Sequence, residues 1–181
     1  MRIATFISCL LITSQTWAGD FKITSTDIVA GKPLQNKNVY QGFGCNGQNI
    51  SPQLNWQGAP ANTKSFAVTV YDPDAPTGSG WWHWVMVNIP ANTTRLDANA
   101  GDVKTSIAPQ GSKQIRTDFG TPGYGGACPP AGDKPHRYQF KVIALDVEKL
   151  DLNSDSTAAL AGFYLHAHTL DTATLEAVYS R

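Results

Sequence analysis

Short runs with a period of two constrain the fold of this chain more than any other feature. In residues 65–71, Phe66, Val68 and Val70 fall on one face of an extended segment, and the residues between them fall on the other. Pro73 then ends the run, because proline has no backbone N–H to donate to a sheet. Such runs, separated by clusters of Gly, Pro and Asn, predict an all-β domain instead of helices joined to crossover strands.

Two more runs have the same period. Residues 82–89 predict a strand ending at Pro90, with His83, Val85, Val87 and Ile89 on one face and Trp82, Trp84, Met86 and Asn88 on the other. Residues 136–145 predict another strand, in which His136, Tyr138, Phe140, Val142 and Ala144 share a face. Arg137 points to the opposite side, so we expect it to be a structural ion-pair partner and not a ligand.

Helical signals appear only near the C-terminus. Ser154 or Asp155 is a suitable N-cap for a short helix through Ala161. Asp171 is a suitable N-cap for a second helix over residues 172–179. The expected fold class is therefore all-β with minor α.

The remaining segments give weaker signals. Residues 163–168 predict a strand with Tyr164, His166 and His168 on one face. Residues 95–125 are mostly polar and predict loops plus a strand near Ile115. A loop region of this length inside a compact domain is often functional.

The N-terminus has the pattern of a secretory signal peptide. Arg2 precedes an apolar run over residues 3–12, which is shorter than the roughly 20 residues that a membrane helix needs. Thr16-Trp17-Ala18 supplies a small-residue cleavage site, so we predict cleavage after Ala18 and one mature domain over residues 19–181. A buried core helix is the alternative, and Gly19-Asp20 disfavours it because no amphipathic continuation follows.

The charge balance argues against a nucleic-acid partner. The chain has 14 basic and 14 acidic residues, and loss of Arg2 leaves 13 basic against 14 acidic. Binding to phosphate backbones normally needs a basic surplus or stripe, and the Lys and Arg residues here are scattered. After residue 18, no segment of the sequence is long and apolar enough to predict stable insertion into a membrane.

Cysteine usage favours an oxidising compartment. Cys9 leaves with the signal peptide, so the mature chain keeps Cys45 and Cys128. In an exported protein such a pair suggests one disulfide, which contributes roughly 2–4 kcal/mol to stability. Two free thiols, or a catalytic cysteine beside a histidine, remain the alternatives.

Two segments combine rigid turns with titratable side chains. One runs from Asp72-Pro73-Asp74-Ala75-Pro76 to Trp81-Trp82-His83, and the other runs from residues 123–130 to His136-Arg137-Tyr138. Prolines fix φ and glycines permit close backbone approach, so both segments hold their shape with little help from packing. On spacing alone, ordinary turns whose Asp side chains bond to their own backbone explain them equally well.

These segments resemble the two signature regions of the phosphatidylethanolamine-binding (Raf kinase inhibitor-like) family. The matching residues are Asp72-Pro73-Asp74-Ala75-Pro76, Trp81, His83 and Asn88 in one region, and Pro129-Pro130 with His136-Arg137-Tyr138 in the other. The likeness to the bacterial branch rests on Asn49-Ile50-Ser51-Pro52, residues 77–84 and Arg116-Thr117-Asp118-Phe119-Gly120. The resemblance extends from about Phe21 to the C-terminus.

The resemblance implies a Greek-key sandwich of two antiparallel sheets with a C-terminal helix, and a small pocket that accepts phosphate-like anions. By motif position, the pocket residues are Asp72, His83, Pro129, His136 and Tyr138, with Ala75, Pro76 and Trp81 lining it. Cys128 departs from the family pattern, which has a small residue at that place, and a disulfide there would stiffen the pocket wall. We expect His166 and His168 to satisfy local hydrogen bonds and not to bind ligand.

The chemistry of these side chains suits a phosphate clamp. A histidine donates from a ring nitrogen and titrates near neutral pH, and a tyrosine hydroxyl donates to an anionic oxygen. A carboxylate beside an anion is out of place, so we assign Asp72 an orienting role. By accepting a hydrogen bond from one imidazole N–H, it would fix the tautomer of that ring and favour its cationic form.

The expected function is that of a periplasmic binding protein for a small phosphate-like anion or phosphorylated headgroup, with regulation of a partner protein as a further role. The alternative is a protein-interaction module that inhibits a protease or modulates a host factor. A hydrolase is least favoured, because the sequence has no HExxH pair, no three clear zinc ligands and no Gly-x-Ser-x-Gly elbow. We expect no catalytic residue, metal or cofactor, and the residues leave open whether the chain forms a homodimer.

Overall fold

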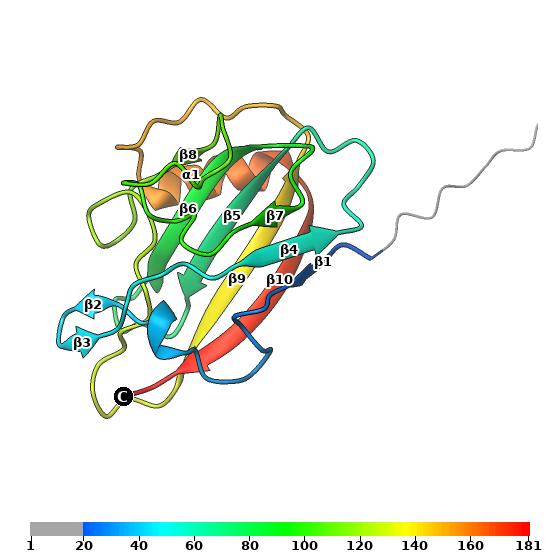
Figure 1. The fold of residues 1–181 in the computed structure, drawn as a ribbon. Helices are drawn as coiled ribbons and strands as arrows, with labels where there is room; N and C mark the ends of the chain where they lie inside the picture. The colour runs from blue at the N-terminus through cyan, green and yellow to red at the C-terminus, as the bar shows by residue number, and fades with distance from the viewer. Residues whose placement is uncertain (1–19) are drawn as a thin grey trace, which may run out of the picture.

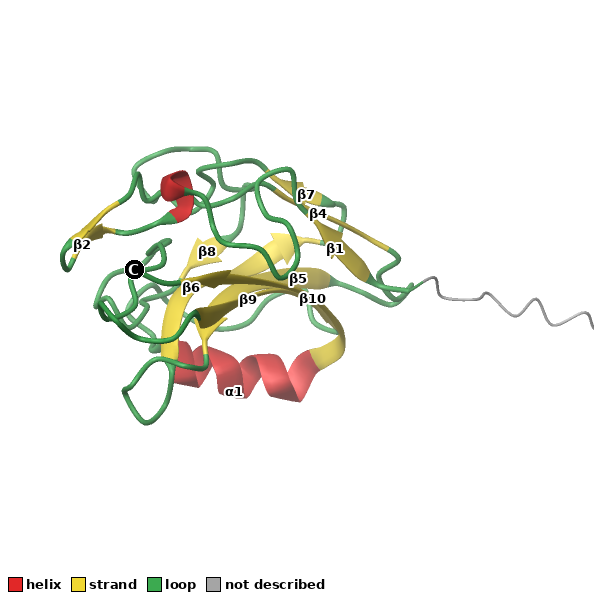
Figure 2. Cartoon of the chain, turned by 90° about the horizontal axis from the view of Figure 1, so that it is seen from below, coloured by secondary structure: helices red, strands yellow, loops and turns green. Residues whose placement is uncertain are grey.

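The computed structural model describes residues 20–181, and its elements form three layers (Figure 1). A large sheet lies in the middle, with a small sheet on one face and an α-helix on the other (Figure 2). The predicted signal peptide, residues 1–18, lies outside the described residues. Within residues 20–181, no helix combines the length and the apolar character needed to cross a membrane.

The large sheet carries both signature segments. Its strand order is β10-β9-β5-β6-β8, and every ladder in it is antiparallel. The strands are β5 (Ser65–Asp72), β6 (Trp81–Pro90), β8 (Lys113–Gln114), β9 (His136–Leu145) and β10 (Thr169–Tyr179). Strands β5, β6 and β9 are those that the period-two runs predict, so the expected β-rich, antiparallel fold class is confirmed.

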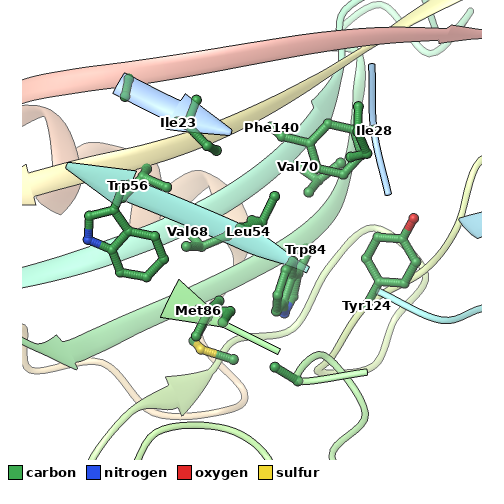
Figure 3. Close-up of a cluster of buried hydrophobic side chains, with 14 of the residues drawn as sticks. Ile23, Ile28, Leu54, Trp56, Val68, Val70, Trp84, Met86, Tyr124 and Phe140 are labelled. Atoms are coloured by element: carbon green, nitrogen blue, oxygen red, sulfur yellow. The ribbon is translucent and has the colours of Figure 1, made fainter. Parts of the chain in front are cut away.

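The small sheet encloses the main core against the large one. Its order is β1-β4-β7, with β1 (Lys22–Thr24), β4 (Leu54–Gln57) and β7 (Arg95–Leu96). Leu54 and Trp56 of β4 lie in one buried cluster with Val68 and Trp84 of the large sheet (Figure 3). Burying each such side chain contributes roughly 1.5–3 kcal/mol, so this cluster holds the two sheets together.

Helix α1 (Ala158–His168) covers the opposite face of the large sheet. It begins at Thr157, whose hydroxyl accepts a hydrogen bond from the Leu160 N–H at 3.1 Å. The predicted caps, Ser154 and Asp155, lie just upstream of this residue. An N-cap of this kind satisfies one of the free N–H groups in the first turn.

Two predictions for the C-terminal region are wrong. Residues 163–168 continue helix α1 instead of forming a strand, because Ala158, Ala161 and Leu165 are buried at helical spacing. Residues 172–179 belong to strand β10 instead of a second helix, and β10 pairs with β9 along its length. Every second residue of β10 packs toward the core, and these include the small Ala173 and Ala177. Such small side chains conceal the alternation in the sequence.

Strand β6 contains two bulges that change which side chains face the core. Val70 pairs with Trp84 and Tyr71 pairs with Trp82, which leaves His83 as an extra residue. A second shift lies at Asn88, which has a φ of +59°. These bulges put His83 and Ile89 on the sandwich side, whereas Val85 and Val87 face the helix. The prediction that these four residues share one face is therefore wrong.

The remaining elements lie outside the two main sheets. They are the 3-10 helix η1 (Asn36–Asn38) and a hairpin of β2 (Gln41–Gly42) and β3 (Cys45–Asn46). The hairpin lies at the same end of the molecule as the C-terminus (Figure 1). The strand predicted near Ile115 is confirmed, because β8 ends directly before Ile115 and the Ile115 N–H donates to the Val85 carbonyl at 2.9 Å.

Candidate functional site

The end of β5 and the start of β9 bring Asp72 and His136 together. Both side chains are almost fully buried, and His136 Nδ1 donates to Asp72 Oδ2 at 2.7 Å. The other carboxylate oxygen of Asp72 accepts from the Asp74 N–H at 2.8 Å, inside the turn that contains Pro73. The bond from the Asp74 N–H holds the Asp72 carboxylate in position, and the carboxylate in turn holds the orientation of the His136 ring. This geometry agrees with the orienting role predicted for Asp72.

His83 reaches the same place from β6 because it is the bulged residue. Its Nδ1 lies 2.8 Å from the Gly125 carbonyl oxygen and 3.1 Å from that of Gly126. Both neighbours are acceptors only, so Nδ1 carries the proton and donates. A side chain at Gly125 would meet the Phe119 ring at 2.3 Å, which explains the glycine at this close approach. Burial lowers the pKa of His83, which keeps the ring neutral at neutral pH.

Two buried donors near these histidines have no hydrogen-bond acceptor in the part of the chain that the structure describes. They are the hydroxyl of Tyr138 and the indole Nε1 of Trp81. Burial raises the pKa of Tyr138 far above its usual value, so its hydroxyl keeps the proton. Buried polar atoms are normally paired, and an unpaired donor costs about 1–3 kcal/mol. Two such donors in one place indicate a site that is completed by a ligand or by water.

All eight predicted pocket residues line one cavity, which we call the His83 cavity. Its volume is about 210 Å³. The predicted residues that line it are Asp72, Ala75, Pro76, Trp81, His83, Pro129, His136 and Tyr138. Phe43, Thr77, Phe119, Cys128 and Pro130 also line it and were not among the predicted ligand residues. The cavity is thus largely apolar, with a few polar groups that converge in it, as is typical of small-molecule sites.

Aromatic rings form the rim of the His83 cavity. Phe119 lies edge-on to both Trp81 and His83, at 5.4 and 5.3 Å between ring centroids. Phe43 stacks on Phe119 at 5.9 Å and is itself 68% exposed. The sequence signal for Phe119 was its place in the 116–120 motif. Phe43 gave only a weak signal, an aromatic residue between two glycines at a hairpin tip.

A disulfide fastens the hairpin to the cavity wall. Cys45 of β3 and Cys128 are joined with a Cα–Cα distance of 6.0 Å, as the sequence predicts. Arg181 adds hydrogen bonds to the carbonyl oxygens of Pro129, at 2.6 Å, and Phe43, at 3.2 Å. Cys128, the departure from the family pattern, is therefore part of the wall and ties it to the hairpin.

Arg137 points away from the cavity and pairs with Asp74. Its Nε and Nη2 donate to the two carboxylate oxygens of Asp74 at 2.8 and 2.9 Å, and its backbone N–H also donates to this carboxylate. The prediction of a structural ion pair is confirmed. This pair links the turn after β5 to the start of β9, the two elements that hold Asp72 and His136.

The carboxyl group of Asp74 is expected to titrate at unusually low pH. Hydrogen bonds from Arg137 lower the pKa of Asp74 from 3.8 to about 2. The ionised Asp74 carboxylate therefore contributes its full stabilisation to the folded state when the pH is above 3.8, the pKa expected in the unfolded chain. This contribution is lost as the pH falls toward 2. An NMR titration of the side-chain carboxyl carbon measures this value directly. Arg137→Gln should return the pKa of Asp74 close to 3.8, and an ordinary value in the unmodified protein would contradict the account.

His166 and His168 do not line the His83 cavity. Both lie in helix α1, and His168 Nδ1 bonds to Asp146 Oδ1 at 2.9 Å, as predicted for a local role. Across residues 20–181, no group of three or more His, Cys, Asp or Glu side chains could hold a metal ion.

A larger cleft of about 450 Å³ shares Phe119 with the His83 cavity. Its other lining residues come mainly from the hairpin region and from the 99–125 segment. We place the candidate site in the smaller cavity, because it is lined by both buried histidines and by the two residues with unpaired donors, Trp81 and Tyr138.

Comparison with known proteins finds one family, by its profile and by individual relatives. The profile of the family described as phosphatidylethanolamine-binding protein matches residues 24–180. The UPF0098 protein YbcL of Escherichia coli K12 is 55% identical over 168 residues, covering 93% of this chain and 92% of the relative. YbhB of the same organism is 50% identical and covers 88% of this chain and 99% of the relative.

Solved structures agree with the fold. The crystal structure of E. coli YbcL superimposes with a TM-score of 0.89 and covers 90% of this chain and 99% of that chain. A phosphatidylethanolamine-binding protein homolog from Chlamydia trachomatis, CT736, gives a TM-score of 0.73 at 28% identity, with 89% and 97% coverage. The described sandwich is therefore the architecture found in these relatives.

Proposed function

The chain belongs to the phosphatidylethanolamine-binding protein family, and from this premise we propose that it binds phosphate-type anions in the His83 cavity. The observation that carries the proposal is the pair of buried, unpaired donors, the Tyr138 hydroxyl and the Trp81 indole N–H. An anionic oxygen is the acceptor that such donors lack. Hydrogen bonds to a charged group are about twice as strong as neutral ones.

The size of the cavity narrows the class of ligand. Its volume of about 210 Å³ is below the roughly 300–1,000 Å³ typical of drug-sized ligands. Inorganic phosphate or a small phosphorylated headgroup suits such a volume, whereas whole acyl chains do not. The apolar rim of Phe43, Phe119 and Trp81 would contact the carbon part of a phosphate ester.

The proposed role is binding without catalysis. The side chains of the cavity wall with an aliphatic hydroxyl or a sulfur atom, the common nucleophiles of hydrolases, are Thr77 and Cys128. The Thr77 hydroxyl donates to the Gly80 carbonyl and Cys128 is held in the disulfide. Neither the Thr77 oxygen nor the Cys128 sulfur is therefore a free, activated nucleophile, which supports a binding protein over a hydrolase.

A second candidate function is suggested by Phe43. This residue is 68% exposed and has a φ of +51°, an unfavourable backbone conformation for a bulky side chain. The disulfide and Arg181 hold the surrounding hairpin in place. A rigid, exposed aromatic residue is a typical anchor of a protein interface. Inhibition of a protease or modulation of a host factor would use this rim. Phe43→Ala would abolish that activity while leaving the binding of inorganic phosphate intact.

The proposed location is the periplasm. A disulfide between Cys45 and Cys128 is expected to persist only in an oxidising compartment, and the N-terminal sequence has the pattern of an export signal. Mass spectrometry of the protein from a periplasmic fraction would test both the location and cleavage after Ala18.

Calorimetric titration tests the proposed function. Inorganic phosphate and O-phosphorylethanolamine should each bind one site at about pH 6.5. Tyr138→Phe removes only the unpaired hydroxyl and should weaken binding about 10-fold or more, since a charged hydrogen bond contributes about 1.5–3 kcal/mol. Tyr164→Phe on helix α1 is the matched control and should bind like the unmodified protein. No saturable binding of either ligand by the unmodified protein would refute the proposal.

A further inference from the structure

The tautomer of His83 is fixed by the wall of the cavity. Nδ1 faces the carbonyl oxygens of Gly125 and Gly126, which accept but cannot donate. The neutral ring therefore carries its proton on Nδ1 and a lone pair on Nε2. Among the described residues, the hydrogen bonds of the ring are all made by Nδ1, so Nε2 is the ring nitrogen left for a ligand in the cavity that His83 lines.

The Asp72 carboxylate also lines the cavity, but its oxygens already accept from His136 Nδ1 and the Asp74 N–H. The Tyr138 hydroxyl and the Trp81 indole N–H have no acceptor among the described residues. His136 bonds to Asp72 through Nδ1, and its Nε2 lies 3.4 Å from Asp133 Oδ2. A fully deprotonated anion would find hydrogen bonds at these donors and a lone pair at His83 Nε2. Two lone pairs that face each other in a buried site repel, and little water is present to screen them. One additional proton between the ligand and Nε2 turns this repulsion into a hydrogen bond.

We propose that anion binding in the His83 cavity takes up one proton at His83 Nε2, either from solvent onto the ring or with the ligand. The inference rests on the proposed function, and it names the preferred ligand class. An anion that carries an acidic hydrogen, such as a hydrogen-phosphate monoester, brings the required proton with it. An anion without one, such as sulfate, binds only when the ring itself becomes an imidazolium.

The charged groups around His83 fit this account. Asp72 of β5 and Asp118, in the segment after β8, favour the imidazolium, but burial is the larger effect and lowers the pKa of His83. From β9, Tyr138 is neutral, and His136 lies between the carboxylates of Asp72 and Asp133. The segment at 125–126 contributes only carbonyl oxygens. The free site is thus neutral at His83, and the charge of an incoming anion shifts the ring toward protonation.

Titration calorimetry with sulfate tests the inference. Sulfate has no proton to give near neutral pH, so any proton must come from solvent. At about pH 7.5, one unit above the ordinary histidine pKa, the heat in two buffers with different ionisation enthalpies gives the number of protons taken up. We expect close to one proton per sulfate bound, and an affinity that falls about tenfold per pH unit. His83→Asn keeps an N–H that can donate to the Gly125 carbonyl but has no titratable nitrogen. The number of protons that this variant takes up with sulfate should therefore be near zero.

The outcomes separate the inference from the proposed function. Sulfate binding without proton uptake would overturn the inference, and so would proton uptake that persists in His83→Asn. In either case, phosphate binding by the unmodified protein would still support the proposed function. If neither phosphate nor sulfate binds the unmodified protein, the proposed function fails. His168→Asn, which alters a histidine paired with Asp146 outside the cavity, is the matched control and should retain uptake.

A second measurement uses only the unmodified protein, so it does not require that any variant folds. Nitrogen-15 NMR of the imidazole rings distinguishes a protonated from an unprotonated ring nitrogen. In the free protein, His83 Nε2 should have the signal of an unprotonated nitrogen, and saturation with sulfate should move it to that of a protonated one. A His83 Nε2 that is already protonated in the free protein would overturn the inference.

Discussion

Asp72→Asn is expected to weaken the binding of inorganic phosphate about 10- to 100-fold, which corresponds to the roughly 1.5–3 kcal/mol of one charge-assisted hydrogen bond. The carboxylate accepts both from His136 Nδ1 and from the Asp74 N–H. The Asn side chain has only one oxygen, so it can accept from only one of these two N–H groups. Its NH₂ group would face the other N–H, and two donors cannot bond to each other. His136 would then lose its anionic partner, and His83 would lose a charge that favours its protonation.

Asp74→Asn is the matched control for this change. Asp74 lies two residues further along the same turn and pairs with Arg137, outside the His83 cavity. Its replacement should leave phosphate affinity within about twofold, since it removes no group that touches the ligand. Equal losses in Asp72→Asn and Asp74→Asn would show that the turn as a whole matters and that the carboxylate of Asp72 has no specific role.

Removal of the disulfide is expected to lower the free energy of unfolding by about 4 kcal/mol, because the bond closes a long loop in the unfolded chain. Cys45 and Cys128 are separated by 83 residues. The bond also ties the β2–β3 hairpin to the wall that contains Cys128 and Pro129. Urea denaturation of the double variant Cys45→Ala/Cys128→Ala, compared with the oxidised protein, measures the loss.

The reduced form of the unmodified protein provides the control. It should match the double variant in stability, and the double variant should not respond to reductant. A loss below about 1 kcal/mol would contradict the expectation that the bond restrains the unfolded state. We also expect the double variant to bind phosphate more weakly, because the wall is then free to move away from His83.

The strands that form the site could be predicted from the sequence, and their local irregularities could not. The alternation in 65–71 and 136–145 predicts the two strands, and the structure pairs them so that Asp72 and His136 lie at adjoining ends. In β6 the same rule fails, because bulges at His83 and Asn88 shift the register. A bulge leaves no clear mark in a period-two pattern. The position of His83 in the cavity therefore came from the family resemblance and not from periodicity.

The C-terminal region shows a second limit. Strand β10 contains Ala173 and Ala177 at core positions, and alanine suits a helix as well as a strand. Its state is decided by pairing with β9, a long-range contact that a local pattern does not contain. Phe43 was missed for a related reason. Its place on the rim depends on the disulfide, and the pairing of Cys45 with Cys128 does not reveal which neighbouring side chain faces the cavity.

The most direct test of the account follows the indole N–H signals of the tryptophans during an NMR titration with inorganic phosphate. Trp81 lines the His83 cavity and its Nε1 has no hydrogen-bond partner among the described residues. Trp56 Nε1 is also buried and unpaired, but Trp56 lies in the core, outside the cavity. The account predicts a saturable shift of the Trp81 signal toward that of a hydrogen-bonded indole, with Trp56 unchanged. A Trp81 signal that does not move at millimolar phosphate, or that moves together with Trp56, would contradict a phosphate site in this cavity.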